Sequence, residues 1–268
     1  MNLIIFTDLD GSLLDSEDYS FEDAKQALDL LHQKNIPLIL CTSKTRVEVE
    51  QIRKNLGIRH PFIVENGGGI FFESDQDFKI EGARKTGDFF VIQLGESYSV
   101  IRSFVEKNKT RFSIEGFGDW PVGRICELTG LSREEAALAR EREFTEPFLL
   151  KNENDLPALE KEANRANLKI AQGGRFFHLI GKEQDKGRAV EMVKRIYKKN
   201  SGNIFSIGLG DSGNDRSMLQ AVDIPVLIPH PEGNFISFTH PQLVKARYPG
   251  SKGWNEALLR VLNGLNII

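Results

Sequence analysis

The sequence predicts a protein of the α/β class, in which a Rossmann-like core with a parallel sheet is interrupted by an inserted α+β domain. Three observations support this prediction. Short apolar runs alternate with amphipathic helical patterns at both ends of the 268-residue chain, which is typical of a parallel sheet covered by helices. The alternation stops near Gly82 and resumes after residue 173. We therefore expect core segments at 1–85 and 173–268 and a cap domain at 86–172.

The first core segment is expected to contain three strands and two helices. Its strands are the apolar runs at 3–6, 36–41 and 61–64. The first helix starts near Ser20, with Asp23 three positions later in a capping pattern. The second helix covers about 47–56 and ends at Gly57, since glycine often terminates helices.

The insert is expected to mix strands and helices, and the second core segment to restore the alternation. Within the insert, an apolar stretch at 89–94, a glycine-rich turn near Gly116 and helices at about 132–142 and 155–167 can be distinguished. A strand at 175–180 should lead back to the core. The remaining elements expected are a helix at 187–199, a strand at 204–209, a helix from 214, a strand at 224–228 and a last helix from 254.

Composition excludes several classes of protein. The chain has 35 basic and 38 acidic residues, for a net charge of −3, so no basic excess draws it to nucleic acid or to an anionic membrane. No apolar run is long enough to span a bilayer, and the N-terminus lacks the pattern of a signal peptide. Cys41 and Cys126 form no CxxC pattern. We expect a cytoplasmic protein without nucleic-acid or membrane partners.

Two acidic loops each follow a predicted strand. Asp8 and Asp10 follow the first strand, and Asp211 and Asp215 lie in the segment GDSGND at 210–215. Ligands of open α/β sheets bind at the carboxyl ends of the strands, and paired carboxylates are tolerated there when they share a divalent cation. By itself, the first loop is equally compatible with a solvated acidic turn. The glycines at 208–213 also match a dinucleotide fingerprint, but two aspartates would repel the pyrophosphate.

Two further segments are suited to binding phosphate. Thr42 and Ser43 follow the second strand and offer hydroxyl and N–H groups near the start of a helix. Lys186 lies just before another predicted helix, where its charge could neutralise a phosphoryl oxygen. Helix capping for the hydroxyl residues, and a surface position for the lysine, are the alternatives.

Together, these segments resemble, in order, the four motifs of the haloacid dehalogenase superfamily of phosphohydrolases. The motifs are DLDGSLL at 8–14, Thr42-Ser43, Lys186 and GDSGND at 210–215. The resemblance implies that Asp8 attacks phosphorus to form a phosphoaspartate and that Asp10 acts as general acid and base. It also implies that Thr42 and Lys186 hold the phosphoryl oxygens. Mg²⁺ would be bound by Asp8, the backbone carbonyl of Asp10, Asp211 and Asp215.

The insert resembles the α/β cap of the Cof-like sugar phosphatases. Further segments resemble phosphatases that act on mannosyl-3-phosphoglycerate: residues 42–46, 65–68, 142–148, 174–179 and 252–255. This resemblance implies a small phosphorylated glycoside as substrate and a role in forming mannosylglycerate, a compatible solute. Arg142 and Arg175 are expected to bind the carboxylate of the substrate, unless Arg142 belongs to a solvated helix face. The other expected substrate contacts are Ser43, Lys44, Asn66, Glu146 and His178.

Several alternatives remain open at this point. The substrate could be another sugar phosphate or glucosyl-3-phosphoglycerate, and the protein could be a monomer or a homodimer. A phosphomutase is a different class, which release of inorganic phosphate would exclude. A sensor of phosphorylated ligands is a further class, although it would normally lack one of the two acids, Asp8 and Asp10, that are both present here.

Overall fold

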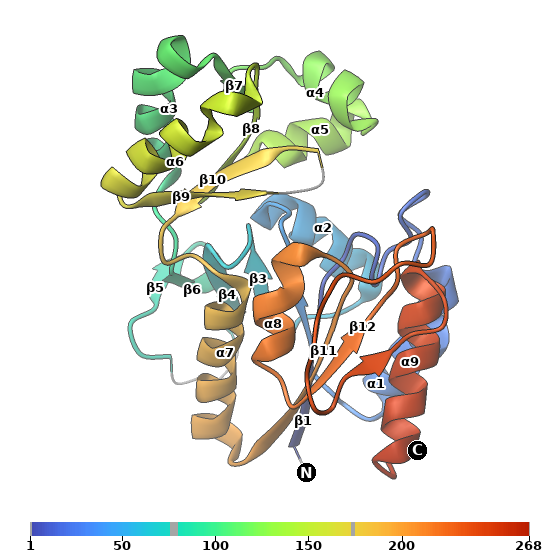
Figure 1. Ribbon diagram of the computed structural model, residues 1–268. Coiled ribbons are helices and arrows are strands. Elements are labelled where there is room, and N and C mark those ends of the chain that lie inside the picture. Colours follow the sequence, from blue (N-terminus) through green and yellow to red (C-terminus); the bar gives the residue numbers. More distant parts are fainter. Residues whose placement is uncertain (1, 76–79, 173–174, 268) are drawn as a thin grey trace.

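Two β-sheets organise the chain, one in the core and one in the insert, as Figure 1 shows. The computed structural model describes residues 2–75, 80–172 and 175–267. The parallel strands of the larger sheet are β1 (Asn2–Thr7), β2 (Leu38–Cys41), β3 (Phe62–Val64), β11 (Ile204–Gly210), β12 (Ile224–Leu227) and β13 (Val244–Lys245). Three antiparallel strands extend it: β4 (Gly69–Glu73), β5 (Arg84–Thr86) and β6 (Phe89–Gln93).

The strand order of the larger sheet is β13-β12-β11-β1-β2-β3-β4-β6-β5. Strands β1 and β11 are neighbours, so the loops that follow them emerge side by side at the same edge. The parallel half of the sheet confirms the predicted α/β class. The antiparallel extension was not expected from the sequence.

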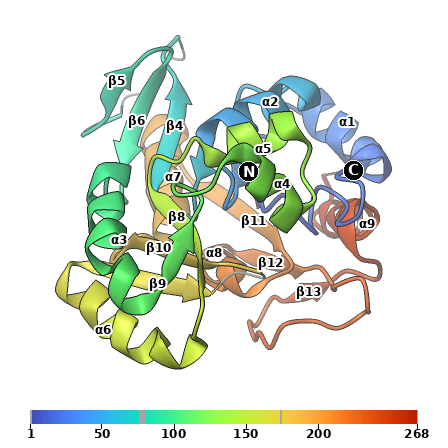
Figure 2. The ribbon, with the colours of Figure 1, turned by 90° about the horizontal axis from the view of Figure 1, so that it is seen from above.

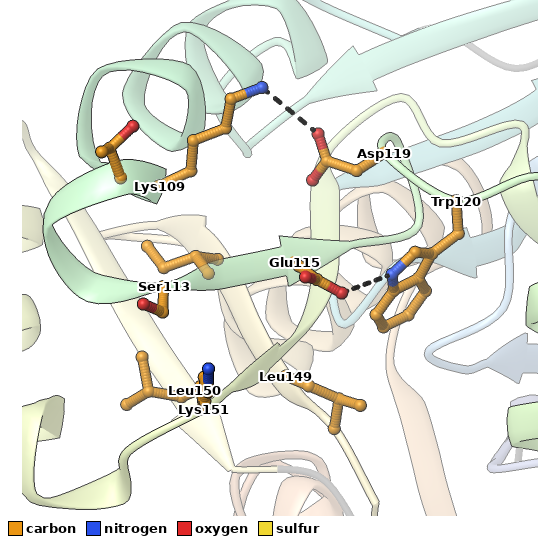
Figure 3. A pocket seen from close by; sticks show the side chains of 10 residues that line it. Lys109, Ser113, Glu115, Asp119, Trp120, Leu149, Leu150 and Lys151 are labelled. Atoms are coloured by element: carbon orange, nitrogen blue, oxygen red, sulfur yellow. Dashed lines mark hydrogen bonds and ion pairs between the residues drawn. The ribbon is translucent and has the colours of Figure 1, made fainter.

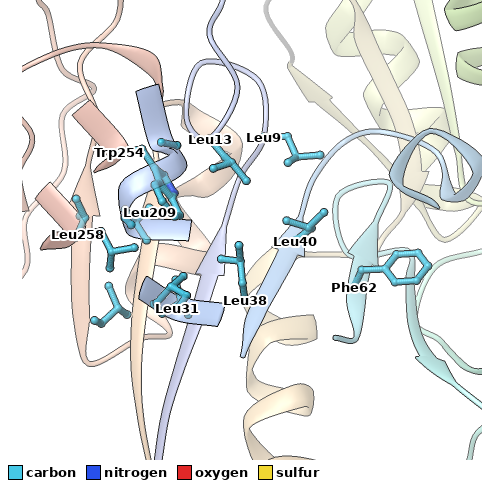
Figure 4. Packing of buried hydrophobic residues seen from close by; sticks show 14 of the residues in the cluster. Leu9, Leu13, Leu31, Leu38, Leu40, Phe62, Leu209, Trp254 and Leu258 are labelled. Carbon is cyan, nitrogen blue, oxygen red and sulfur yellow. The ribbon is translucent and has the colours of Figure 1, made fainter. Parts of the chain in front are cut away.

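Helices cover both faces of the larger sheet (Figures 1 and 2). They are η1 (Glu22–Ala24), α1 (Lys25–Gln33), α2 (Arg46–Leu56), α7 (Lys186–Ser201), η3 (Gly213–Asp215), α8 (Arg216–Gln220) and α9 (Gly250–Gly264). On one face, Leu38 and Leu209 of the sheet share a buried cluster with Leu31 of α1 and with Trp254 of α9 (Figure 4). The opposite face packs against α7 and α8. Buried strands between two helical layers explain the continuous apolar runs in the sequence.

The insert forms a smaller, four-stranded sheet with its own helices. Its sheet has the order β7-β8-β10-β9. The strands are β7 (Ile114–Gly116), β8 (Thr145–Leu150), β9 (Leu168–Gln172) and β10 (Phe177–Gly181). Its helices are α3 (Tyr98–Phe112), α4 (Val122–Thr129), α5 (Arg133–Arg140), η2 (Glu153–Asp155) and α6 (Leu156–Arg165).

Both predicted boundaries of the insert, at 85/86 and 172/173, come too early. Strand β6, expected in the insert, pairs with β4 in the larger sheet. Strand β10, expected to lead back to the core, pairs with β8 and β9 in the smaller sheet. Both are short apolar strands with the same local pattern as core strands, so only their pairing partners decide the assignment. The chain enters the insert near Gly95 and returns after Gly181.

The two crossings between core and insert lie against each other. Gln184 is fully buried between them. Its Oε1 accepts a hydrogen bond from the Gly181 N–H at 3.1 Å, and its Nε2 donates to the carbonyl of Glu65 at 2.5 Å. A Cβ placed on Gly95 would lie 2.4 Å from the same Oε1. One side chain therefore contacts both connections and the core.

The predicted helix ends were right in two places and wrong in three. Helix α2 ends at Gly57 in the left-handed conformation, and Ser132 is the N-cap of α5, where it forms a capping box with Glu135. Ser20 does not begin the first helix: a short 3-10 turn intervenes, and α1 starts at Lys25. Helix α5 stops at Arg140 instead of 142, and α9 starts at Gly250, four residues before the expected Trp254. Among the described residues, none of the helices is long and apolar enough to cross a membrane.

Candidate active site

The aspartates and the lysine of three distant motifs meet at the carboxyl ends of β1 and β11. Asp8 follows β1, Lys186 is the first residue of α7, and Asp215 lies in η3 after β11. Lys186 Nζ is 2.7 Å from Asp8 Oδ1 and 2.7 Å from Asp215 Oδ1. All three side chains are buried, with exposed fractions of 5% for Asp8, 1% for Lys186 and 0% for Asp215. The fold thus brings these three residues together.

The loop after β1 approaches the loop after β11 closely at Gly11. The φ of Gly11 is +73°, and a Cβ on this residue would lie 2.8 Å from Asp211 Oδ2. Ser12 Oγ donates to Asp211 Oδ1 at 3.3 Å, and the Asp8 N–H donates to the Leu209 carbonyl at 2.9 Å. Glycine is required here because both the space and the backbone conformation disfavour a side chain.

The donor set at this site suits a hard divalent cation. Carboxylate oxygens of Asp8, Asp211 and Asp215 all lie within 4.8 Å of one another, and Lys186 supplies one positive charge to the three. Burial raises the pKa of Asp8, and the charge of Asp215 raises it further. Burial and the charge of Asp8 likewise raise the pKa of Asp211. Clustered buried carboxylates repel each other, and a cation with oxygen ligands would relieve that repulsion. The residues present therefore fit Mg²⁺.

Asp10 stands apart from this cluster and pairs with Lys44. Lys44 Nζ is 2.9 Å from Asp10 Oδ1 and 4.0 Å from Glu48 Oε1. Burial alone would lower the pKa of Lys44, but the charges of Asp10 and Glu48 outweigh it and raise the pKa. The Asp10 side chain is 42% exposed, so it is open to a leaving group and to water. The expected metal ligand from Asp10 is its backbone carbonyl, not its carboxylate.

The segment after β2 forms a tight loop at the same edge of the sheet. Thr42 is 1% exposed, and its Oγ1 accepts a hydrogen bond from the Lys44 N–H at 3.2 Å. The capping alternative does not hold for Thr42 and Ser43, because Thr45 begins α2 and forms the capping box with Glu48. The loop formed by residues 42–44 is called the phosphate loop below, after its expected role.

Asn66 lies close to the second acidic loop. Its Oδ1 accepts a hydrogen bond from Asn214 Nδ2 at 3.2 Å, and it is 8% exposed. It follows Glu65, to which we assigned no role from the sequence. Glu65 is fully buried and contacts the insert; the only signal for it was the surrounding sequence ENGG.

Arg142 lies at the junction between insert and core, not on a solvated helix face. It follows the end of α5, donates from Nη1 to the Ser43 carbonyl at 2.9 Å and from Nε to the Ala139 carbonyl at 2.8 Å. Its guanidinium lies 5.5 Å from the centre of the Phe117 ring. The alternative that assigned it to a charged surface is therefore wrong, because the helix ends before Arg142 and the chain turns inward.

His178 lies on β10 and is partly buried. Burial and the nearby charge of Arg142 lower the pKa of His178 to about 3. The imidazole is therefore neutral, and its buried Nδ1 has no hydrogen-bond partner among the described residues. Arg175, in contrast, is exposed, and its contact with substrate stays a prediction.

Glu146 does not have the free carboxylate that was expected of it. It is fully buried. Its Oε2 accepts a hydrogen bond from the Tyr98 hydroxyl at 2.6 Å. Its Oε1 accepts hydrogen bonds from Arg102 Nη1 at 3.0 Å and from the Gly118 N–H at 2.9 Å. Because no part of Glu146 is exposed, its carboxylate is closed to sugar hydroxyls in this structure. Glu146 instead holds β8 to α3 and to the turn after β7.

An open pocket of about 830 Å³ lies on the insert (Figure 3). Two pairs of its polar groups contact each other: Trp120 Nε1 donates to Glu115 Oε2 at 3.3 Å, and Lys109 Nζ is 3.8 Å from Asp119 Oδ1. None of its ten lining residues belongs to the acidic cluster or to the phosphate loop. The pocket is therefore separate from the candidate active site.

The fold and the four converging motifs define a hydrolase of the haloacid dehalogenase type. A family model described as haloacid dehalogenase-like hydrolase matches residues 5–229, and the chain belongs to this family. Two curated relatives, both named glucosyl-3-phosphoglycerate/mannosyl-3-phosphoglycerate phosphatase, extend the comparison. The protein from Persephonella marina is 51% identical, with 97% of each chain covered, and the one from Methanococcoides burtonii is 42% identical, with 100% covered.

A solved structure shares the fold over the whole chain. A Thermoplasma acidophilum protein superimposes with a TM-score of 0.68 at 19% identity, covering 100% of both chains. The family and the named relatives together make this chain an enzyme, a phosphoric monoester hydrolase.

Proposed function

We propose that this enzyme is a magnesium-dependent phosphatase that releases phosphate from mannosyl-3-phosphoglycerate and from glucosyl-3-phosphoglycerate. The observation that carries the proposal is the buried contact of Asp8 with Lys186 beside the acidic cluster. The names of the two relatives support the choice of substrates and favour acceptance of both hexoses. Glucosyl-3-phosphoglycerate, an alternative at the level of the sequence, thus joins the mannosyl compound as a proposed substrate.

In the proposed reaction, Asp8 and Asp10 have the roles that the resemblance to the family implies. A carboxylate oxygen of Asp8 attacks phosphorus, a phosphoaspartate forms, and the bond from phosphorus to the glycerate oxygen breaks as Asp10 donates a proton to that oxygen. Asp10 then takes a proton from water, which attacks phosphorus and releases phosphate from Asp8. Lys186, fixed against Asp8 Oδ1, and Thr42 hold the phosphoryl oxygens.

Asp8, Asp211, Asp215 and the backbone carbonyl of Asp10 would hold the magnesium ion. When bound, Mg²⁺ offsets negative charge on the transferring phosphoryl group. The protein residues do the rest: Lys186 orients the nucleophile, and the exposed Asp10 exchanges protons with the leaving group and with water.

Recognition of the leaving group is assigned to residues around the junction with the insert. Arg142, held at the phosphate loop, and Arg175 would bind the carboxylate of the glycerate. Asn66 and His178 would bind sugar hydroxyls; the Nδ1 of His178 has no hydrogen-bond partner among the described residues. Ser43 and Lys44 would contact the substrate from the phosphate loop.

A phosphate-release assay over a panel of phosphorylated glycosides tests the proposal. Both glycosyl-3-phosphoglycerates should be hydrolysed with Mg²⁺ and not in excess chelator. Asp8→Asn should abolish release because an amide is a poor nucleophile, whereas Glu17→Gln, an exposed carboxylate in the same loop, should retain the rate. Turnover by Asp8→Asn near the native rate would contradict the covalent mechanism.

Two other outcomes would identify the alternative functions. Transfer of phosphate to a second sugar position, without free phosphate, would identify a mutase. Binding of the phosphorylated glycoside without turnover would identify a sensor.

A further inference from the structure

Glu65 is a buried carboxylate of the core that binds three successive residues of the insert. Its Oε1 accepts the Glu143 N–H at 2.8 Å. Its Oε2 accepts the Phe144 N–H at 3.1 Å and the Thr145 hydroxyl at 2.6 Å. The side chain is 0% exposed. Both oxygens thus bind the insert, and the Glu65 carbonyl accepts the Gln184 side chain that lies between the two crossings.

The backbone around Glu65 is tied to the catalytic loops. The Glu65 N–H donates to the Lys44 carbonyl at 3.0 Å, and the Asn66 N–H donates to the Thr42 carbonyl at 2.9 Å. Glu65 and Asn66 have φ values of +50° and +58°, a left-handed conformation that is uncommon outside glycine. Such backbone persists where surrounding contacts over-determine it. Glu65 therefore joins the phosphate loop to the insert through a rigid turn.

Burying the carboxylate of Glu65 is energetically unfavourable. We take this as an argument that the carboxylate serves to orient the groups that it binds. Burial raises its pKa, although the charge of Arg142 and the Thr145 hydrogen bond oppose the shift. An apolar side chain could fill the space without the cost of desolvating a carboxylate. A carboxylate, unlike an apolar group, fixes the direction of three donors at once.

Arg142 immediately precedes the three residues that Glu65 binds. Its Nη1 donates to the Ser43 carbonyl at 2.9 Å. Its Nη2 makes no hydrogen bond to the described parts of the chain, so this side of the guanidinium is available to an anion. The position of Arg142 over the phosphate loop depends on the path of the segment that Glu65 holds.

We propose that Glu65 is a positioning residue for substrate recognition. By binding residues 143–145 it holds Arg142 over the phosphate loop, where the guanidinium binds the carboxylate of the glycerate. This inference rests on the proposed function, because it assigns the carboxylate of that substrate to Arg142.

Steady-state kinetics of Glu65→Gln tests the proposal. The amide keeps the shape but turns an N–H₂ group toward donors, so the KM for both glycosyl-3-phosphoglycerates should rise at least tenfold. An aryl phosphate has no carboxylate for Arg142, and its KM should move much less. Thr145→Val removes one donor to Glu65 and also an acceptor that lies 3.4 Å from Arg142 Nη1, so it should act in the same direction and more weakly. Glu143→Gln is the matched control: it breaks the ion pair with Arg46 at 2.7 Å but keeps the backbone N–H that Glu65 binds, and its KM should stay within twofold.

A double-mutant cycle separates positioning from a merely structural role. Arg142→Ala alone should raise the KM for the full substrate about 10–150-fold, the loss expected for a charge-assisted hydrogen bond. If Glu65 acts through Arg142, adding Glu65→Gln to that variant should change the KM by less than twofold. Effects that multiply, or an equal rise in KM for the aryl phosphate, would overturn the proposal.

Amide hydrogen exchange tests the contact itself without substrate. The amides of Glu143 and Phe144 should exchange at least tenfold faster in Glu65→Gln than in the wild type or in Glu143→Gln. Unchanged exchange would overturn the proposal whatever the kinetics. If exchange responds as expected but the wild type hydrolyses neither glycoside, the proposed function fails, and with it the assignment of the carboxylate to Arg142.

Discussion

Lys186 remains charged in a place where a lysine would ordinarily lose its proton. Burial alone would lower the pKa of Lys186, but the charges of Asp215 and Asp8 outweigh it and raise the pKa. With Nζ at 2.7 Å from an oxygen of each partner, the ammonium acts as a fixed positive charge and not as a proton donor. The proposed mechanism assigns proton transfer to Asp10, whose side chain is 42% exposed and lies outside the cluster.

The imbalance of charge predicts that Asp211→Asn stabilises the metal-free protein. The pKa of Asp211 is raised by burial, by Asp8 and by Asp215, so above its unfolded pKa this residue lowers stability, and a neutral amide removes that cost. The amide oxygen can still accept the Ser12 hydroxyl. In excess EDTA at pH 7.5, thermal unfolding should give a gain on the order of 1 kcal/mol, or a Tm increase of about 2–4 °C.

Added Mg²⁺ should stabilise the wild type more than Asp211→Asn. The wild-type Tm should rise with Mg²⁺ concentration, as binding to the folded state requires, and the rise should be smaller for Asp211→Asn. Asp29→Asn, an exposed site on α1, should match the wild type under both conditions. A lower Tm for Asp211→Asn in EDTA would show that repulsion does not dominate in the cluster.

At the scale of elements, the sequence predicted the strands that carry the active site better than those at the edge of the insert. The runs before Asp8 and Asp211 are apolar and end in loops with recognisable chemistry, so local pattern was sufficient. For β6 and β10 the local pattern was correct, but the choice of sheet depends on partners far along the chain. The roles of Glu65 and Glu146 were not predictable for the same reason, because hydrogen bonds between distant segments determine both.

His60, in the connection between α2 and β3, is expected to make the free energy of unfolding depend on pH. The neutral ring accepts the Leu38 N–H at Nδ1, at 3.3 Å. Burial, together with the charge of Arg53, lowers the pKa of His60 from 6.5 to about 4. Because the folded pKa lies below the unfolded one, this contribution is present above pH 6.5 and is lost as the pH falls toward 4.

Urea unfolding at several pH values measures this effect. Between pH 7 and pH 5 the loss due to His60 should be about 1–2 kcal/mol. His60→Gln retains an acceptor for the Leu38 N–H and cannot be protonated. Between pH 7 and pH 5 its free energy of unfolding should therefore fall by about 1–2 kcal/mol less than that of the wild type. Parallel curves for the two proteins would assign the pH dependence to other groups, His178 among them.

At the scale of the whole molecule, core and insert have largely separate hydrophobic clusters and are joined through side chains at their junction. Phe144 of the insert packs into a core cluster, Glu65 binds the same segment, and Gln184 contacts both crossings. Among the described residues, the remaining clusters of the insert contain residues of the insert itself. The geometry of the junction therefore depends on these buried side chains, together with the hydrogen bonds from Thr45 to Leu138 and from Arg46 to Glu143.

Gly95→Ala should destabilise the protein through this junction. The new methyl group would lie 2.4 Å from Gln184 Oε1, so the glutamine must move and lose its bonds to Gly181 and Glu65; overpacking of this kind costs about 1–3 kcal/mol. Gly123→Ala is the matched control, since nothing lies within 4 Å of a Cβ on this exposed residue of α4. Its effect should be neutral or stabilising by up to about 1 kcal/mol. Equal urea midpoints for both variants would show that the crossing tolerates movement of Gln184.

The contact between the two crossings also bears on how such an enzyme can change its substrate. The chain leaves the core at Gly95 and returns near Gly181, and these two points are almost in contact. A different inserted domain could therefore span them without displacing the strands beneath. Asp8, Asp10 and the acidic loop would keep their places, and the chemistry with them. Such a replacement domain must present hydrogen-bond donors to Glu65. This buried carboxylate would otherwise be left unpaired next to the phosphate loop.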